Sequence, residues 1–399
     1  MLISPIFDFF TVAERRANWT VTMSALAFVQ TGMLFFAIPL LSLKSRREKM
    51  FFRCMAGFFL YAFLYAIYAA SDLFCPMFGL ISALGSTLVS ILFYVSVRDN
   101  IVSHKTFVYV LAYASVFVIV PQVLVQIDTA GYAQLTRNIG TVNVLFGYEN
   151  PRAVGWISTI CLSIMVAYLS TQPNENRIPP LFLPLIAISA TALFWSGSRG
   201  GLAAFALSIS ILFFASQTRN YKGLLSALFF IGVGGAASNF FYQPSTSYGM
   251  FGRISDSLEQ ETIAAASSGR IELWNTTITY IFERPLTGYG FFPHKNLDGY
   301  PGGSAHNIIL DFWLWCGAII GTIILLCGLL LWVRAFAFFR RANDQYVSAL
   351  FCMMTTLCAY CMISGPYART FPIFLFAIAT GVILGRRSSK AGQATRSEP

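Results

Sequence analysis

Residues 307–333 read NIILDFWLWCGAIIGTIILLCGLLLWV and contain a single charged residue, Asp311. A helix needs about twenty consecutive, mostly apolar residues to cross the hydrocarbon core of a bilayer. This run is long and apolar enough, so it predicts a membrane-spanning helix over 307–333. Similar apolar runs recur on both sides of it, so the chain as a whole is expected to be a helical membrane protein.

The apolar runs extend along the whole chain. Of the 399 residues, 56% are hydrophobic and 11% are charged, and the mean hydropathy is +0.64. A soluble domain has about a quarter charged residues. The sequence therefore predicts an all-α polytopic membrane protein with about eleven transmembrane helices, within a range of ten to twelve. The expected spans are 20–43, 51–70, 77–97, 106–127, 153–170, 178–195, 200–216, 223–241, 307–333, 346–364 and 371–385.

The basic residues indicate how these helices are oriented. Seventeen of the 27 Lys and Arg residues fall in one alternating set of loops, and the other ten fall in the opposite set. Cytoplasmic loops are enriched in Lys and Arg, so the first set is expected on the cytoplasmic side. The net charge of +10 is thereby explained by topology, since no charged stretch interleaves with aromatic residues as in a nucleic-acid groove. The side of the N-terminus stays open.

One long polar segment interrupts the spans. We expect about eight transmembrane helices before it and about three after it. The expected regions are N-terminal helices over 1–241, an external loop over 242–305, C-terminal helices over 306–385 and a disordered cytoplasmic tail over 386–399.

The second half of the external loop has helical periodicity. Apolar residues recur there at three- and four-residue steps, which predicts an amphipathic helix over 270–282 on the membrane surface. Arg284-Pro285 is expected to end this helix, and Gly288-Tyr289-Gly290 to turn the chain. The apolar residues are Ile271, Trp274, Ile278 and Ile281.

Two arginines of the external side are candidates for binding an anionic group. Arg199 lies in a turn of small residues, SGSRG at 196–200, that joins two spans with hardly any loop. Arg270 opens the expected surface helix, where the helix dipole does not favour a positive charge. A guanidinium binds phosphate through two parallel hydrogen bonds. Taken alone, each arginine is equally well explained as an anchor at the membrane interface.

His306 is the candidate general base. It lies where the loop meets the apolar run, and the chain has only two other histidines, His104 and His294. A histidine can take a proton from a hydroxyl near neutral pH, although a histidine at a helix start is more often a cap or an interfacial residue. Asn307 and Asp311 follow one turn apart on one face of the next helix.

Asp311 is expected to pair with a group near His306, because an unpaired carboxylate inside an apolar span is costly. It lies five residues after His306, on a different face of the helix, which argues against a simple His–Asp dyad.

Neither a metal nor a cofactor is expected. The eight cysteines lie in or beside apolar runs and are expected to pack as small hydrophobic side chains. The chain has no His-x-x-x-His, no Asp-x-Asp and no Gly-rich loop with a lysine for a nucleotide. The energy for any reaction would have to come from the substrate.

Three pieces of sequence together resemble the O-antigen ligase and polymerase family of bacterial envelope glycosyltransferases, including exopolysaccharide polymerases. The turn at 196–200 resembles the family's Ser-x-Ser-Arg motif. The stretch 269–290, with Arg270, Trp274 and then Pro285-Leu-Thr-Gly-Tyr-Gly290, resembles its Arg…Trp…Pro-x-x-Gly-x-Gly run. His306-Asn307, followed after nine residues by Gly317, resembles its His-Asn-x9-Gly motif. The resemblance covers about 183–330.

The resemblance implies a GT-C-like enzyme of the bacterial inner membrane. Its donor would be an oligosaccharide on undecaprenyl diphosphate, and its other partners a glycan acceptor (a lipid-linked repeat or the lipid A core) and membrane lipids. Arg199 and Arg270 would neutralise the diphosphate on the periplasmic face. His306 would take the proton from the acceptor hydroxyl as it attacks the anomeric carbon with inversion and without metal. Secondary candidates are Arg152, Arg369, Asn307 and Asp311.

The subtype and two rival functions stay open. Ile320 stands three residues after Gly317, where ligases tend to carry a small residue or Tyr, so a polymerase is favoured over a lipid A-core ligase, and a protein hydroxyl is a third acceptor. A transporter or flippase for lipid-linked glycan would place charges near mid-bilayer in repeated halves, which this chain lacks. A non-catalytic membrane scaffold is the other alternative.

Overall fold

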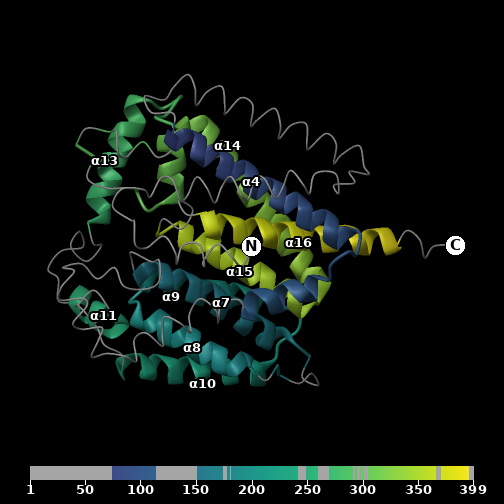
Figure 1. Ribbon diagram of the computed structural model, residues 1–399. Coiled ribbons are helices and arrows are strands. Elements are labelled where there is room, and N and C mark those ends of the chain that lie inside the picture. Colours follow the sequence, from purple (N-terminus) through teal and green to yellow (C-terminus); the bar gives the residue numbers. More distant parts are fainter. Residues whose placement is uncertain are drawn as a thin grey trace. The chain divides into compact units, whose positions relative to one another are not determined.

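The computed structural model describes residues 74–113, 151–173, 178–179, 181–240, 249–258, 269–290, 293, 297, 299–300, 304–364 and 370–394. Every regular element in these ranges is a helix, as predicted (Figure 1). The expected spans 20–43 and 51–70, and most of 106–127, lie outside the described residues.

The helices follow the predicted spans closely. They are α4 (Phe74–Arg98), α7 (Pro151–Thr171), α8 (Phe182–Trp195), α9 (Arg199–Ala215), α10 (Tyr221–Ala237), α11 (Met250–Leu258), α13 (Arg270–Glu283), α14 (Ile308–Ala342), α15 (Gln345–Cys361) and α16 (Thr370–Ala394). α16 continues past the expected end at 385, so much of the segment expected to be a disordered tail is helical.

Three helical stretches of the described chain are long and apolar enough to cross a membrane: Val154–Thr171, Tyr221–Phe240 and Ile308–Ala342. They agree with the predicted membrane class, while the number of spans stays a prediction.

The chain divides into two compact units, and each is described by itself. Among the described residues, the first comprises those within 103–262 and 336–360, and the second comprises those within 74–102, 263–335 and 361–394.

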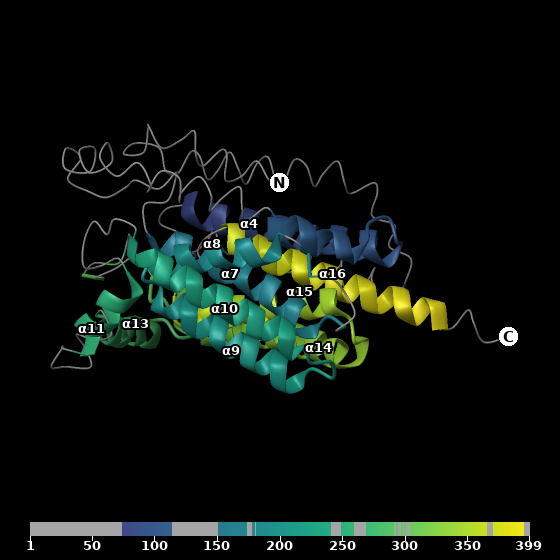
Figure 2. The ribbon, with the colours of Figure 1, turned by 90° about the horizontal axis from the view of Figure 1, so that it is seen from below.

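In the first unit, α7 is the central helix. Its stretch Val154–Thr171 is fully buried, and α8, α9 and α10 pack against it (Figure 2). The Thr356 hydroxyl of α15 is hydrogen-bonded to those of Ser163 on α7, at 2.7 Å, and Ser208 on α9, at 2.6 Å. Such hydroxyl pairs join helices where water is absent, so this cluster ties three helices together.

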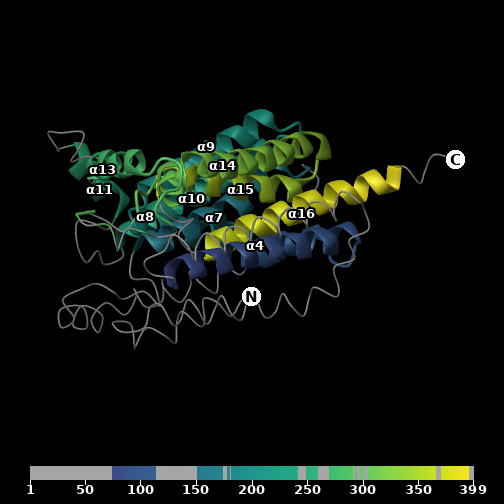
Figure 3. The ribbon, with the colours of Figure 1, turned by 90° about the horizontal axis from the view of Figure 1, so that it is seen from above.

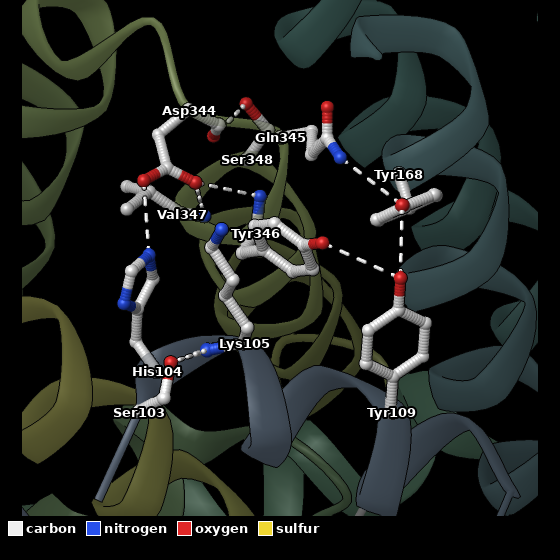
Figure 4. A network of polar contacts seen from close by, with 10 residues as sticks. All are labelled: Ser103, His104, Lys105, Tyr109, Tyr168, Asp344, Gln345, Tyr346, Val347 and Ser348. Carbon is white, nitrogen blue, oxygen red and sulfur yellow. Dashed lines mark hydrogen bonds and ion pairs between the residues drawn. The ribbon is translucent and has the colours of Figure 1, made fainter. Parts of the chain in front are cut away.

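A second polar network lies where α15 begins (Figure 4). His104 Nε2 and Asp344 Oδ2 are 2.9 Å apart, and the Tyr109 hydroxyl is hydrogen-bonded to those of Tyr168 and Tyr346. Asp344 Oδ1 also accepts from the amides of Tyr346 and Val347, which caps α15. Burial opposes the charged form of Asp344, but its bond to His104, the charge of His104 and these two amides together lower the pKa of the carboxyl.

Removing this carboxylate is expected to destabilise the protein. Asp344→Ala deletes a helix cap and leaves the buried His104 without that partner, which should cost about 2–4 kcal/mol of unfolding free energy. Asp344→Asn keeps a capping oxygen and should cost less. Because the pKa of Asp344 is lowered by folding, the stabilisation is present above the unfolded pKa of about 3.9 and is lost as the pH falls through the folded pKa.

Melting temperatures of the purified protein in detergent, at pH 7 and at about pH 3, test this expectation. The difference in melting temperature between wild type and Asp344→Ala should be large at pH 7 and small at about pH 3. Equal melting temperatures of the two proteins at pH 7 would show that the Asp344 carboxylate does not stabilise the fold.

In the second unit, α4 and α16 lie side by side (Figures 1 and 3). The Tyr94 hydroxyl of α4 is hydrogen-bonded to that of Ser388 on α16 at 3.1 Å. The same unit contains a small apolar core made by Ile281 of α13, Leu314 and Trp315 of α14, and Cys361. This core joins α13 to the beginning of α14.

α14 is broken at Gly317, so the expectation of one uninterrupted helix over 307–333 was wrong. Gly317 has φ 78° and ψ 162°, a conformation that is essentially restricted to glycine. The segment before the break, 308–316, is about 14 Å long at about 1.5 Å per residue, too short for a hydrocarbon core of about 30 Å. Asp311 therefore belongs to a short helix that precedes the long apolar one.

The loop after α13 satisfies the backbone at this break. The amides of Tyr289 and Gly290 donate to the carbonyls of Leu314 and Trp315 at 2.8 and 2.9 Å, and the Ala318 amide donates to the Pro285 carbonyl at 2.6 Å. A Cβ on Gly317 would lie 2.2 Å from the Leu286 carbonyl oxygen. The Pro-x-x-Gly-x-Gly run at 285–290 therefore contacts the backbone around Gly317, the glycine of the His-Asn-x9-Gly motif.

Candidate active site

His306 lies in a strained turn directly before α14. Its φ is 55°, in the left-handed region, which costs a residue other than glycine about 1–3 kcal/mol and persists only where the surroundings hold it. The His306 amide donates to Ser304 Oγ at 3.0 Å. The residue as a whole is half-buried, and its Nδ1 atom is buried.

Asp311 is fully buried and reaches back to this turn. Its two carboxylate oxygens accept from Ser304 Oγ, at 2.8 Å, and from the Ala305 amide, at 3.0 Å. The pairing expected of this carboxylate is therefore with Ser304 and Ala305. The pKa of Tyr300 is raised to about 12, mainly by burial. The charge of Asp311 also raises this pKa, while the hydrogen bond to Thr277 opposes the increase.

Asn307 has a structural role in this turn. Its Oδ1 accepts from the amides of Ile309, at 3.0 Å, and Leu310, at 3.3 Å. This is the pattern of a helix N-cap, for which asparagine is among the preferred residues. The oxygen of Asn307 is thus engaged in starting α14.

Arg270 and Trp274 bring α13 against the same turn. Trp274 Nε1 donates to the carbonyl of Ala305, the residue before His306, at 2.8 Å. Arg270 lies one turn earlier on the same face and donates through Nη1 to the Ile363 carbonyl. The start of α13 therefore lies at the His306 turn, which explains the Arg…Trp spacing.

The apolar residues of α13 occupy both buried and exposed positions. The helix spans Arg270–Glu283, close to the predicted 270–282. Thr277 and Ile281 are its buried residues, whereas Ile278, expected in the apolar stripe, is 39% exposed. Trp274 donates to the Ala305 carbonyl, the Thr277 hydroxyl is hydrogen-bonded to that of Tyr300, and Ile281 packs in the small apolar core.

Arg199 belongs to the first unit, where it is the first residue of α9 and is half-buried. The small residues of its turn make close contacts within the first unit. Ser198 Oγ is hydrogen-bonded to the Tyr360 hydroxyl at 2.6 Å, and a Cβ on Gly155 would lie 2.4 Å from Ser198 Cβ. The turn is small because α7 and α15 pack closely on it, and this packing fixes where α9 begins.

The two secondary arginines are less fully described. Arg152 lies in the first turn of α7, just before Gly155, so this end of α7 lies at the Arg199 turn. Its side chain lies outside the described part of the chain, as does the whole of Arg369.

No role was predicted for Ser304 and Tyr360, and the hydrogen bond from Trp274 to the His306 turn was not predicted either. Trp274 had a usable signal, since it lies four residues after Arg270 and so shares its helix face. Ser304 and Tyr360 had none, because their partners are set by tertiary contacts. Within the described ranges, no three or more His, Cys, Asp or Glu side chains gather where they could hold a metal ion.

These observations define a class: a helical membrane protein in which a histidine turn is fixed between α13 and a broken apolar helix, α14. Residues 184–326 match the model of the family described as O-antigen ligase. This match confirms the predicted family resemblance, over nearly the stretch that carried the three motifs.

Two curated proteins of Acinetobacter baylyi are similar to part of the chain. The ComP-specific O-oligosaccharyltransferase is 24% identical over 162 residues, which are 38% of this chain and 26% of that protein. The General O-oligosaccharyltransferase is 23% identical over 146 residues, 34% of this chain and 24% of that protein. The chain thus spans about a quarter of the length of the relatives that it matches.

Proposed function

We propose that this protein transfers an oligosaccharide from a polyprenyl diphosphate to the hydroxyl of an acceptor glycan. The observation that carries the proposal is the His306 turn, which is held in a left-handed conformation against the start of α13, where Arg270 lies. The O-antigen ligase match includes both elements, and the names of both relatives describe oligosaccharyl transfer to oxygen.

The proposed reaction is a single displacement. The acceptor oxygen forms a bond to the anomeric carbon, and the bond from that carbon to the diphosphate breaks with its electron pair leaving on the diphosphate. His306 takes the proton of the acceptor hydroxyl, as a general base. Attack from the face opposite the leaving group inverts the anomeric centre, and no metal takes part in these steps.

The arginines stabilise the leaving group in this proposal. Negative charge grows on the diphosphate as the bond breaks, and preorganised cations lower the energy of that state. Arg270 takes this role at the His306 turn. The same role for Arg199 rests on its Ser-Gly-Ser-Arg-Gly turn and its position at the start of α9.

The remaining parts of the proposal concern the setting. We place the protein in the bacterial inner membrane, with about eleven spans in a GT-C-like arrangement and with His306 on the periplasmic face. The donor lipid is undecaprenyl diphosphate. The favoured acceptor is a second lipid-linked repeat, because Ile320 replaces the small residue or Tyr of ligases, and lipid A core and a protein hydroxyl are the other acceptors to test.

Substitution of the arginines tests the proposed function. Arg270→Ala and Arg199→Ala are each expected to lower the rate of transfer by about 10²–10³-fold, as for the loss of one preorganised donor at a developing anion. Lysine at either position keeps the charge but loses the two-pronged geometry, so it should restore only part of the rate. Arg284→Ala is the matched control, because Arg284 is exposed and stacks on Tyr289.

The assay has two arms, polysaccharide profiles of a complemented deletion strain at matched protein levels and turnover of the purified protein with a defined lipid-linked donor. Loss of long glycan with accumulation of lipid-linked single repeats supports a transferase. If single repeats are still transferred to lipid A while long glycan is lost, the protein is a polymerase and not the ligase. Normal glycan and turnover in both alanine variants would refute the assignment and favour a scaffold or a transporter.

A further inference from the structure

The inference concerns Asp311, a buried carboxylate that the proposed reaction does not use directly. It lies in the short helix segment before the break at Gly317 and has no exposed surface. Burying a carboxylate is costly unless hydrogen bonds compensate. Ser304 Oγ and the Ala305 amide donate to Asp311, and both belong to the turn that carries His306.

The bonds from Asp311 continue to the backbone of His306. Ser304 Oγ donates to Asp311 Oδ2 and accepts from the His306 amide at 3.0 Å. The Ala305 amide donates to Asp311 Oδ1, while the Ala305 carbonyl accepts from Trp274 Nε1. Both peptide groups that precede His306 are therefore fixed, one by Asp311 directly and one through Ser304.

Starting the helix does not require this carboxylate. Asn307 already caps α14 through the amides of Ile309 and Leu310. The bonds of Asp311 run in the opposite direction, to residues before the cap. What they hold is the left-handed conformation of His306, at φ 55°, which an L-residue leaves readily unless its neighbours prevent it.

We propose that Asp311, acting through Ser304, is the positioning residue that holds the His306 imidazole in its reactive orientation. This rests on the proposed function, in which His306 is the general base. A base must lie within hydrogen-bond reach of the proton that it takes, and a small displacement of such a group lowers the rate steeply. Asp311 has no exposed surface and Ser304 almost none, so their loss should act on turnover rather than on donor binding.

The test is steady-state kinetics of the purified full chain with a defined lipid-linked donor and acceptor. Asp311→Asn keeps the shape but loses one accepting oxygen, so kcat should fall about tenfold, whereas Asp311→Ala loses both and kcat should fall about a hundredfold. Ser304→Ala, which removes only the hydroxyl between Asp311 and His306, should resemble Asp311→Asn. The KM for the donor should stay within about twofold in all three. Glu272→Gln, on an exposed residue of α13, is the control and should match wild type.

The outcomes separate this inference from the function on which it rests. If His306→Ala keeps wild-type turnover, the proposed function itself fails. If His306→Ala is inactive while Ser304→Ala and Asp311→Asn keep wild-type kcat, the function stands and the positioning role is overturned. The role is equally overturned if kcat is retained and only the donor KM rises. Ser304→Ala decides the question even if Asp311→Ala does not fold.

Discussion

His306→Ala is expected to reduce the rate of transfer by about 10²–10⁴-fold, the contribution of a positioned general base. His306→Asn should be equally inactive, and its loss of activity should come from the missing imidazole alone. Asparagine adopts the left-handed conformation more readily than alanine does, so it keeps the turn at φ 55° while it lacks a basic nitrogen. Loss of activity in both variants would separate the chemistry of the imidazole from the geometry of the turn.

The measurement is single-turnover transfer together with the melting temperature of each purified variant. His306→Asn should melt no lower than wild type, whereas His306→Ala should melt lower because of its backbone. His294→Asn, at the other histidine of the loop, is the control and should transfer normally. A His306→Asn protein that is folded and fully active would remove His306 from the chemistry.

Gly317→Ala is expected to have the largest effect on stability. Its φ of 78° and ψ of 162° are strained for any residue with a side chain, and the new Cβ would overlap the Leu286 carbonyl at 2.2 Å. Together these effects should cost about 3 kcal/mol or more. The loop at 285–290 would be forced off the broken helix, and the carbonyls of Leu314 and Trp315 would lose their donors.

Folded yield and melting temperature in detergent measure this effect. Gly328→Ala is a matched control in the same helix, because a Cβ there meets nothing within 4 Å. That variant should be unchanged or slightly more stable, since alanine favours a helix over glycine by about 0.5–1 kcal/mol. Similar yields for the two variants would show that the break tolerates a side chain.

Local pattern predicted part of this structure well. The helix that begins at Arg270 follows from three- and four-residue periodicity, which is a property of the chain segment itself. The break at Gly317 could not be predicted in this way, because the run around it is apolar throughout and the conformation depends on amides from 289 and 290. Periodicity alone did not show which residues of this helix contact the protein, because the spacing of the exposed Ile278 fits as well as that of the buried Thr277.

The candidate site was predictable to a similar extent. The motifs indicated His306 and Arg270, and the structure places the His306 turn against the start of α13. The contacts of the serines in the Arg199 turn could not be predicted, because the sequence does not show that α7 and α15 pack against them. The pair of His104 and Asp344 had no signal, since its members lie far apart in the chain and each is an ordinary polar residue at a helix start.

The break at Gly317 also bears on the order of events during biosynthesis. The insertion machinery meets 307–333 as one continuous apolar run, which satisfies its own backbone in lipid only while it is an unbroken helix. A break made in lipid would expose the carbonyls of Leu314 and Trp315, so it must wait until Tyr289 and Gly290 can donate to them. Segment 307–333 is therefore expected to insert first as one unbroken membrane-spanning helix. The break at Gly317 and the turn of His306 are expected to form afterwards.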